Sequence, residues 1–230
     1  MSPKRTKRPV TAKEMKSYDN YTIEKIGVPS MVLMEHAAIA SVEVLNESFD
    51  LKKVLCVASA GNNGGDAFAV ARLLFLKGID VEILFLGNRD KCSTETTQQY
   101  KICENYNIRI YDNDLNVISK GGYTVIIDGI FGIGLDRNIE GKYKETIDKI
   151  NEVSQSGETK VLALDIPSGL LADTGEVMGT SVRANKTVTF AYNKVGMTVK
   201  QGPKHAGEVI VKDIGIYMPE DLKYQYITSG

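Results

Sequence analysis

The chain has 230 residues, 43% of them hydrophobic and 25% charged, which is the composition of an ordinary globular protein. This length suits one α/β domain with a sizeable hydrophobic core. The formal net charge of −1 gives no general attraction to nucleic acid or to an anionic membrane, so any phosphate site must be built locally. No apolar run approaches the ~20 residues that a membrane span needs.

The three cysteines, Cys56, Cys92 and Cys103, fit neither a zinc pattern nor a disulfide framework. Cys56 lies in an apolar run and is expected in the core. A reducing, cytoplasmic location is the simplest interpretation of these cysteines. The basic residues between positions 4 and 8 are not followed by an apolar stretch, so they indicate a frayed tail rather than a secretory signal.

Two helices are expected before the first strand. The segment Thr11-Ala-Lys-Glu14 has the form of a capping box and predicts a helix that runs to about Ile26. Gly27 ends this helix, and Pro29 suits the first turn of the next one. The second helix is expected to reach about Ser48.

The rest of the chain alternates strands with helices. Strands are predicted at Val54–Ala58, Val81–Leu86, Thr124–Asp128, Val161–Asp165, Lys186–Phe190 and Glu208–Val211. Helices are predicted at Asp66–Lys77, Ser93–Tyr106 and Tyr143–Val153. This alternation predicts an α/β fold with a mostly parallel sheet covered on both faces, and the lack of a linker predicts one domain over residues 1–230.

Polar segments follow three of the predicted strands. They are Gly61-Asn-Asn-Gly-Gly-Asp66, Asp128 with Gly132-Ile-Gly134, and Asp165-Ile-Pro-Ser-Gly169. In an open α/β sheet, ligands bind outside the carboxyl ends of the strands. We therefore expect these three segments to converge on one crevice.

The glycine-rich segment after the first strand has two interpretations. Its glycines would let the backbone approach a phosphate closely at a helix start, with Asp66 capping the helix or contacting a ligand hydroxyl. The alternative is a tight turn with an Asp cap. The spacing matches neither the dinucleotide fingerprint nor the Walker A pattern.

Asp128 and Asp165 are each the first polar residue after an apolar strand. An unpaired buried charge is costly, so the alternatives are a capped loop or a buried ion pair on one side, and a cation ligand, a ribose-hydroxyl acceptor or a proton-transfer group on the other. Asn63, Asp128 and Ser168 all carry oxygen atoms, which a hard cation prefers. His36 and His205 lie far apart in sequence and form no cluster for a transition metal.

These segments together resemble the YjeF N-terminal domain family, the NAD(P)HX epimerases. The resemblance extends, in chain order, over Arg8-Pro-Val-Thr11, Val32-Leu-Met-Glu35, the three polar segments, Asp173-Thr-Gly175, Thr187-Val-Thr-Phe190 with Lys194, and Asp213-Ile-Gly-Ile216. The chain departs from the family at His36, where asparagine is common, at Ala67, where glycine is common, and in the segment Tyr192–Gly196.

The resemblance implies a Rossmann-like three-layer αβα fold with two leading helices, a homodimer, and a site for hydrated NADH or NADPH. It implies that the nucleotide is contacted by Asn62, Asn63, Gly64, Gly65, Asp66, Gly132, Ile133, Gly134, Leu135, Asp136, Arg137, Asn138 and Asp165. It also implies a potassium ion, K⁺, held by Asn63, Asp128 and Ser168.

The activity implied is interconversion of the R and S epimers at C6 of NADHX and NADPHX. The nitrogen lone pair beside C6 stabilises the cation formed when the hydroxyl leaves or the ring opens. We predict that Asp165 transfers the proton, with Asp128 mainly a cation ligand and Lys194 either a phosphate contact or a surface residue. An ATP- or ADP-dependent dehydratase that consumes the S epimer is the expected functional partner, and no dehydratase domain is expected after Ile216.

Three other interpretations remain open at this stage. The first is a non-catalytic nucleotide-binding or protein-interaction scaffold on the same fold, which the intact set of Asn63, Asp128, Asp165 and Ser168 disfavours. A dehydrogenase is disfavoured by the missing dinucleotide fingerprint, and a phosphotransferase by the missing Walker A lysine.

Overall fold

The computed structural model describes residues 8–217, so the expectation of a frayed tail lies outside the described residues except at Arg8. Seven parallel strands of this part form one sheet in the order β3-β2-β1-β4-β5-β6-β7. The strands are β1 Lys53–Ser59, β2 Asp80–Leu86, β3 Arg109–Asp112, β4 Val125–Gly129, β5 Lys160–Leu164, β6 Lys186–Phe190 and β7 Glu208–Lys212. The predicted α/β class is confirmed, and every strand pair is parallel.

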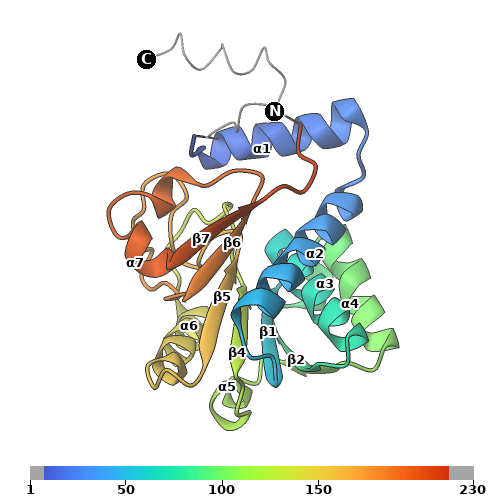
Figure 1. The fold of residues 1–230 in the computed structure, drawn as a ribbon, viewed down its shortest axis with the longest axis vertical. Coiled ribbons are helices and arrows are strands. Elements are labelled where there is room, and N and C mark those ends of the chain that lie inside the picture. Colours follow the sequence, from blue (N-terminus) through green and yellow to red (C-terminus); the bar gives the residue numbers. More distant parts are fainter. Residues whose placement is uncertain (1–7, 218–230) are drawn as a thin grey trace.

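Helices cover both faces of the sheet. They are α1 Ala12–Asn20, α2 Ser30–Ser48, α3 Asn62–Leu76, α4 Thr94–Asn105, α5 Asn116–Lys120, α6 Gly141–Ser154 and α7 Gly202–Ala206. Alternate residues of each central strand point to opposite faces, so that Cys56 and Ile127 pack under α2 and α3 while Leu55 and Ile126 pack against α5 and α6. The molecule therefore has the three layers expected of a Rossmann-like fold (Figure 1).

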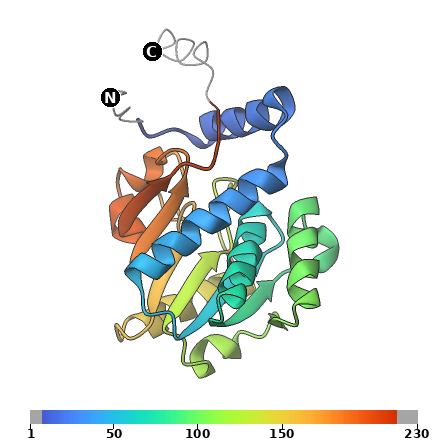
Figure 2. The ribbon, with the colours of Figure 1, turned by 45° about the vertical axis from the view of Figure 1, so that its right-hand side comes forward.

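The first predicted helix is two elements in the structure. The capping box is present, because the Thr11 hydroxyl accepts from the Glu14 N–H and the Glu14 carboxylate accepts from the Thr11 N–H. After α1 the chain continues as a π-helix, Tyr21–Ile26, which ends at Gly27 with φ +88°. Figures 1 and 2 show α1 crossing the top of the molecule and α2 descending beside the sheet.

The helix after β1 begins earlier than predicted. It starts at Asn62 with Gly61 as N-cap, whereas the sequence analysis placed its start near Asp66. Asp66 is therefore in the second turn of α3 and does not cap it, so the interpretation of Asp66 as a cap is wrong. The error arose because a run with three glycines resembles a loop, whereas burial holds it in a helix.

One strand, two α-helices and the 3-10 helices Arg89–Lys91 and Val195–Met197 were also not predicted from the sequence. The strand β3 has only four residues, and α5 and α7 have five each. They are short, and the periodic pattern that identifies a longer element does not develop over so few residues. The remaining predicted strands and helices are confirmed to within two residues at each end.

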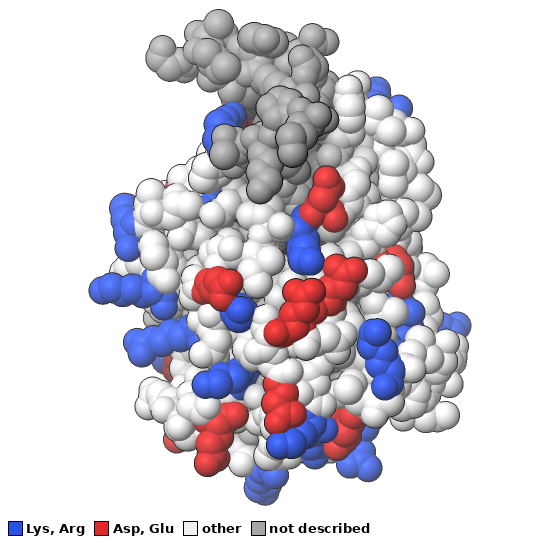
Figure 3. Space-filling view, viewed as in Figure 1, with Lys and Arg blue, Asp and Glu red and all other residues white. Residues whose placement is uncertain are grey.

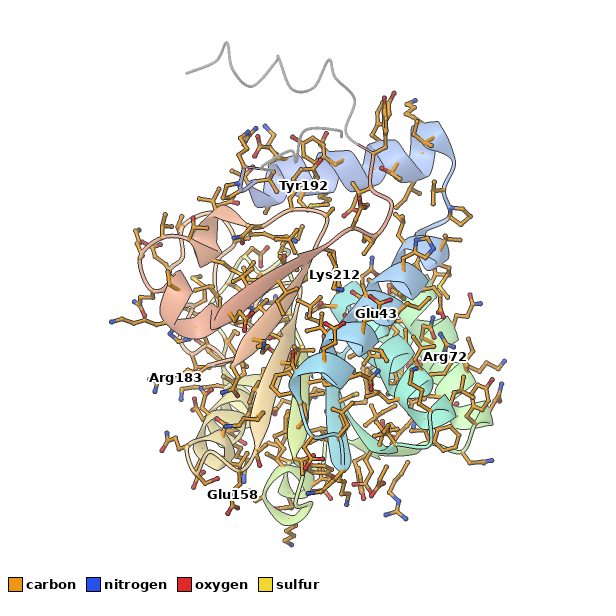
Figure 4. All side chains as sticks on the ribbon, in the orientation of Figure 1. Glu43, Arg72, Glu158, Arg183, Tyr192 and Lys212 are labelled. Carbon is orange, nitrogen blue, oxygen red and sulfur yellow. The ribbon has the colours of Figure 1, made fainter. Side chains whose placement is uncertain are left out.

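The C-terminal segment is tied to the two leading helices. In Figure 4, Lys212 at the end of β7 lies near Glu43 on α2, and the two form an ion pair of 3.3 Å. His36 Nδ1 lies 3.1 Å from the carbonyl oxygen of Ile214. His36, which departs from the family pattern, therefore makes a structural contact with the C-terminal segment.

The surface carries both signs of charge. Acidic and basic side chains are interspersed over the face seen in Figure 3, in agreement with the net charge near zero. In the part of the chain that the structure describes, no helix is long and apolar enough to cross a membrane. Cys56, Cys92 and Cys103 are free thiols, and Cys56 is buried as expected.

Candidate active site

A cavity of about 650 Å³ opens at the carboxyl ends of β1, β4 and β5. It lies beside the point where the strand order reverses, between β1 and β4, which is where ligands bind in open α/β sheets. Of the predicted substrate contacts, the cavity is lined by Asn62, Asn63, Asp66, Gly132, Ile133, Gly134, Leu135, Asp136, Arg137 and Asp165. Its volume falls within the ~300–1,000 Å³ of small-molecule sites.

Gly64 and Gly65 do not line this cavity; they lie where α3 packs closely against its neighbours. A Cβ at Gly64 would lie 1.8 Å from the backbone oxygen of Ser59, and one at Gly65 would lie 2.6 Å from the Met34 side chain. These glycines are therefore explained by packing. Asn138, also predicted as a contact, is outside the lining as well.

The end of β4 is joined to the loop after β5 through Asp128. This fully buried carboxylate accepts from the Ser168 hydroxyl at 2.6 Å, from the Ser168 N–H at 2.8 Å and from the Ile130 N–H at 3.2 Å. The Ser168 hydroxyl also accepts from the Phe131 N–H at 2.8 Å. Burial raises the pKa of Asp128 to about 6, although the hydrogen bonds from Ser168 and Ile130 oppose this effect.

Asn63 is a buried amide whose two polar side-chain atoms, Oδ1 and Nδ2, have no hydrogen-bond partner among the described residues. Its side chain lies against Gly132, since a Cβ built there would be 3.5 Å from Asn63 Cβ and 3.8 Å from Oδ1. A buried amide without partners is costly, so the position favours an additional ligand. No group of three or more His, Cys, Asp or Glu side chains suited to a metal occurs among the described residues. A cation site built from Asn63, Asp128 and Ser168 has only one carboxylate and does not belong to that class of site.

Asp165 follows β5 in the left-handed region, with φ +64°. Its N–H donates to the carbonyl oxygen of Val188 at 2.7 Å, which fixes the turn. The Asp165 carboxylate accepts a short hydrogen bond from the ammonium of Lys194 and is only 14% exposed. The strand end therefore directs a paired carboxylate into the cavity.

Lys194 is fully buried, so the expectation of a surface lysine is wrong. Its ammonium donates to Asp165, to the Thr189 hydroxyl at 2.7 Å and to the carbonyl oxygen of Phe190 at 3.1 Å. All three hydrogen atoms of the ammonium thus have acceptors. The loop that departs from the family sequence between Tyr192 and Gly196 still delivers the lysine to the site.

Asp66 on α3 and Asp19 on α1 also line the cavity, as do Glu95 and Asp136. Burial, with the charges of Asp165 and Asp19, raises the pKa of Asp66 well above its usual value. Burial and the charge of Asp165 also raise the pKa of Asp19, to about 6, against the opposing charge of Lys194. The sequence analysis did not single out Asp19, although its spacing of four residues from both Met15 and Ile23 places it on one helical face with them.

A family model, curated relatives and a solved structure were compared with this chain. The family model for YjeF-related protein N-termini matches residues 30–196. The NAD(P)H-hydrate epimerase of Oenococcus oeni is 49% identical over 212 residues, which cover 91% of this chain and 98% of that protein. The NAD(P)H-hydrate epimerase of Weissella koreensis is 47% identical over 214 residues, 93% of this chain and 94% of that protein. The crystal structure of yeast ynu0 has the same fold, with a TM-score of 0.79 at 20% identity over 95% of this chain and 93% of that chain.

Proposed function

Since this chain belongs to the family of YjeF-related protein N-termini, we infer that it is an NAD(P)H-hydrate epimerase, an isomerase that interconverts the C6 epimers of hydrated NADH and NADPH. The similarity to curated epimerases over more than nine-tenths of the chain carries this conclusion. The cavity at the carboxyl ends of β1, β4 and β5 supports it, because it brings a paired carboxylate, Asp165, to a site of suitable size. We further propose that residues 1–230 form one domain.

We propose that Asp165 transfers protons to and from the C6 hydroxyl. Epimerisation requires the bond between C6 and its oxygen, or the ring bond between C6 and nitrogen, to break and form again on the other face. Lys194 holds the Asp165 carboxylate in place and stabilises its charge, so that the carboxylate can accept a proton. Removal of such a group typically lowers a rate by ~10²–10⁴-fold.

The segments 62–66 and 132–138 are proposed to bind the nucleotide. Asn62 and Asn63 form the first turn of the fifteen-residue helix α3, whose free N–H groups and positive dipole end favour a phosphate. Arg137 lines the same cavity and offers a guanidinium to the pyrophosphate. Gly64 and Gly65 shape the first segment through their close packing, and both glycines and Asn138 lie outside the cavity lining.

We propose that Asn63, Asp128 and Ser168 hold K⁺. The donor set fits, because all three supply oxygen atoms and because the Asn63 Oδ1 is buried without a partner among the described residues. A bound cation would supply fixed positive charge beside the loop 132–138, next to the anionic nucleotide. The hydrogen bonds from Ser168 to Asp128 hold the two side chains together at this position.

The cellular setting proposed for the enzyme is the cytoplasm, where the three cysteines remain reduced. It would act before an ATP- or ADP-dependent dehydratase that consumes the S epimer, and it would form a homodimer. Nucleic acid and membranes are not proposed as partners, since the net charge is −1.

The alternative is a scaffold that binds nucleotides without catalysis. A coupled assay separates the two: purified R-NADHX is mixed with K⁺, ATP and an S-specific dehydratase, and the recovery of NADH is followed with and without this protein. If the protein is an epimerase, NADH should be recovered clearly faster with the protein than by spontaneous epimerisation. Nucleotide binding without faster recovery would instead support the scaffold.

A further inference from the structure

One face of α1 and of the π-helix forms a wall of the cavity. Met15, Asp19 and Ile23 follow one another at intervals of four residues, and all three line the cavity. Met15 and Ile23 are apolar, so Asp19 is the carboxyl group that this face presents between them. The structure gives the Asp19 carboxyl group no hydrogen bond or ion pair with any described residue, whereas Asp165 is paired with Lys194.

This wall is fixed at both ends. Ahead of α1, the Val10 N–H donates to Asn193 at 2.9 Å and the Val10 carbonyl oxygen accepts from the Val195 N–H at 3.0 Å, on either side of Lys194. In the π-helix, the Thr22 hydroxyl accepts from the N–H of Tyr217 at 2.9 Å. A π-helix often marks a functional position, and here these contacts hold Asp19 at a set place relative to Lys194.

Aromatic packing closes the space between α1 and the loop after β6. The rings of Tyr18 and Tyr192 lie 5.6 Å apart, and Tyr192 overlaps α1 in the view of Figure 4. Tyr18 precedes Asp19, so this contact restrains the same turn of the helix. The position of Asp19 is therefore organised before substrate arrives, as catalysis requires.

We propose that Asp19 is a second proton-transfer residue of the epimerisation, acting from the α1 wall while Asp165 acts from the end of β5. This inference rests on the proposed epimerase function. Inversion requires a group to leave one face of the ring and to return on the other. Two proton carriers on different walls of the cavity can serve the two faces without rotation of the ring.

In the first step, the protonated carboxyl group of Asp19 gives its proton to the C6 hydroxyl oxygen. The C6–O bond breaks with its electron pair on oxygen, water leaves, and the nitrogen lone pair forms a C=N double bond, which makes the ring cationic. In the second step, water attacks C6 from the other face, the nitrogen regains its electron pair, and the proton released passes to the Asp165 carboxylate. The reverse reaction starts from the protonated Asp165 and restores the proton to Asp19.

The electrostatics of the cavity suit this division of roles. The Asp165 carboxyl group accepts a hydrogen bond from the Lys194 ammonium, while burial raises the pKa of Asp19 to about 6, where a carboxyl group exchanges its proton readily near neutral pH. Burial, with the charges of Asp165 and Asp19, raises the pKa of Asp66 well above its usual value. Asp165, Lys194 and Asp66 interact electrostatically with Asp19. The other titratable and charged groups that line the same cavity are Lys16 on α1, Glu95 on α4, Asp136 and Arg137 after β4, and Tyr143 on α6.

The test is the rate of epimerisation of single NADHX epimers by the wild type, Asp19→Asn, Asp19→Glu and Glu24→Gln across pH values on both sides of 6. The reaction requires one proton on the pair Asp19 and Asp165. The wild-type kcat should therefore fall as the pH rises above the Asp19 pKa of about 6, where this proton is lost. Asp19→Asn should lower kcat by ~10²–10⁴-fold with little change in KM, and it should remove this alkaline decline. Asp19→Glu should have a higher kcat than Asp19→Asn and should show part of the alkaline decline of the wild type.

Glu24 is the matched control, because it lies on the exposed side of the π-helix and does not line the cavity. Glu24→Gln should match the wild type. A folded Asp19→Asn variant with the wild-type kcat, or with a lowered kcat but the same alkaline decline, would overturn the role of Asp19. An inactive wild type would instead overturn the epimerase function itself. Reaction in ¹⁸O-labelled water should place solvent oxygen at C6, and its absence would contradict the proposed bond cleavage.

Discussion

Lys194 shows how the surroundings of one residue decide its role. In the sequence it follows a predicted strand and has no feature that separates it from a surface lysine. In the fold it is fully buried and donates to Asp165, Thr189 and Phe190. A buried charge persists only when it is paired and hydrogen-bonded, so Lys194 fixes the Asp165 carboxylate in one position, as the proposed proton transfer requires.

Asp66 should make stability depend on pH. Its folded-state pKa is raised by burial and by the nearby carboxylates, so the folded state keeps the proton over a range in which the unfolded state loses it. Stability is therefore greatest below the unfolded pKa and falls as the pH rises toward the folded pKa. Asp66→Asn removes this loss, so its Tm should exceed that of the wild type at pH 8.

The advantage of Asp66→Asn should shrink toward pH 4, where the carboxyl group is protonated in both states. Thermal unfolding of both proteins at a series of pH values checks this. A constant difference in Tm at every pH would show that the Asp66 carboxyl group does not titrate differently on folding.

Asn63 should determine how the protein responds to potassium. If its buried amide oxygen binds K⁺, added K⁺ stabilises the wild type by about 2.7 kcal/mol at 100 times the dissociation constant. Asn63→Ala should lose most of this K⁺-dependent rise in Tm. Without K⁺ the variant should be at least as stable as the wild type, because it no longer buries two unpaired polar atoms.

The matched measurement replaces K⁺ by a bulky organic cation at equal ionic strength, which separates a bound ion from general screening. An equal response of the wild type to both cations would contradict the site.

At the level of the elements, α3 requires its glycines for packing. A Cβ at Gly64 would lie within 1.8 Å of the Ser59 backbone oxygen, and backbone cannot move aside as a flexible side chain does. Gly64→Ala should therefore lower the free energy of unfolding by about 1–3 kcal/mol or more, as measured by urea denaturation. Gly134→Ala is the control: a Cβ there meets nothing within 4 Å, so its stability should be nearly unchanged.

The pair of variants also decides between the two explanations of the glycine-rich segment. If Gly64 served only to admit a phosphate, Gly64→Ala would weaken nucleotide binding and leave the stability of the empty protein intact. That result would contradict the packing explanation.

The leading helices show which boundaries the sequence could predict. The capping box set the start of α1 at Ala12, and Gly27 set the end of the π-helix, because both depend on local backbone chemistry. The change from α-helix to π-helix after Asn20 was not predictable. In this segment Thr22 contacts Tyr217 of the distant C-terminal segment, a contact that no local pattern contains.

For the whole molecule, the layered fold was predictable because buried parallel strands have continuous apolar runs, as in β1 and β4. The short, half-exposed β3 at the sheet edge was missed, since its residues Arg109–Asp112 show no such run. The convergence of the segments after β1, β4 and β5 followed from strand direction alone.

Within the site, all three strand-end segments contribute residues to one cavity, Asp165 among them, whereas Asp128 and Ser168 are buried and do not line it. Asp19 and the burial of Lys194 were not predicted, because they depend on how α1 packs over the sheet and on the loop after β6. Such contacts join residues far apart in sequence, here through the bridge between Val10 and Lys194.

The central claim is that this cavity epimerises hydrated NADH through Asp165. The most direct measurement starts from a single purified NADHX epimer and follows its conversion to the other epimer by chromatography, with the wild type, with Asp165→Asn and without protein. The account predicts rapid equilibration with the wild type and a rate ~10²–10⁴-fold lower with a folded Asp165→Asn variant that still binds the nucleotide. Equal rates for the two proteins, or a wild-type rate no faster than the uncatalysed one, would contradict it.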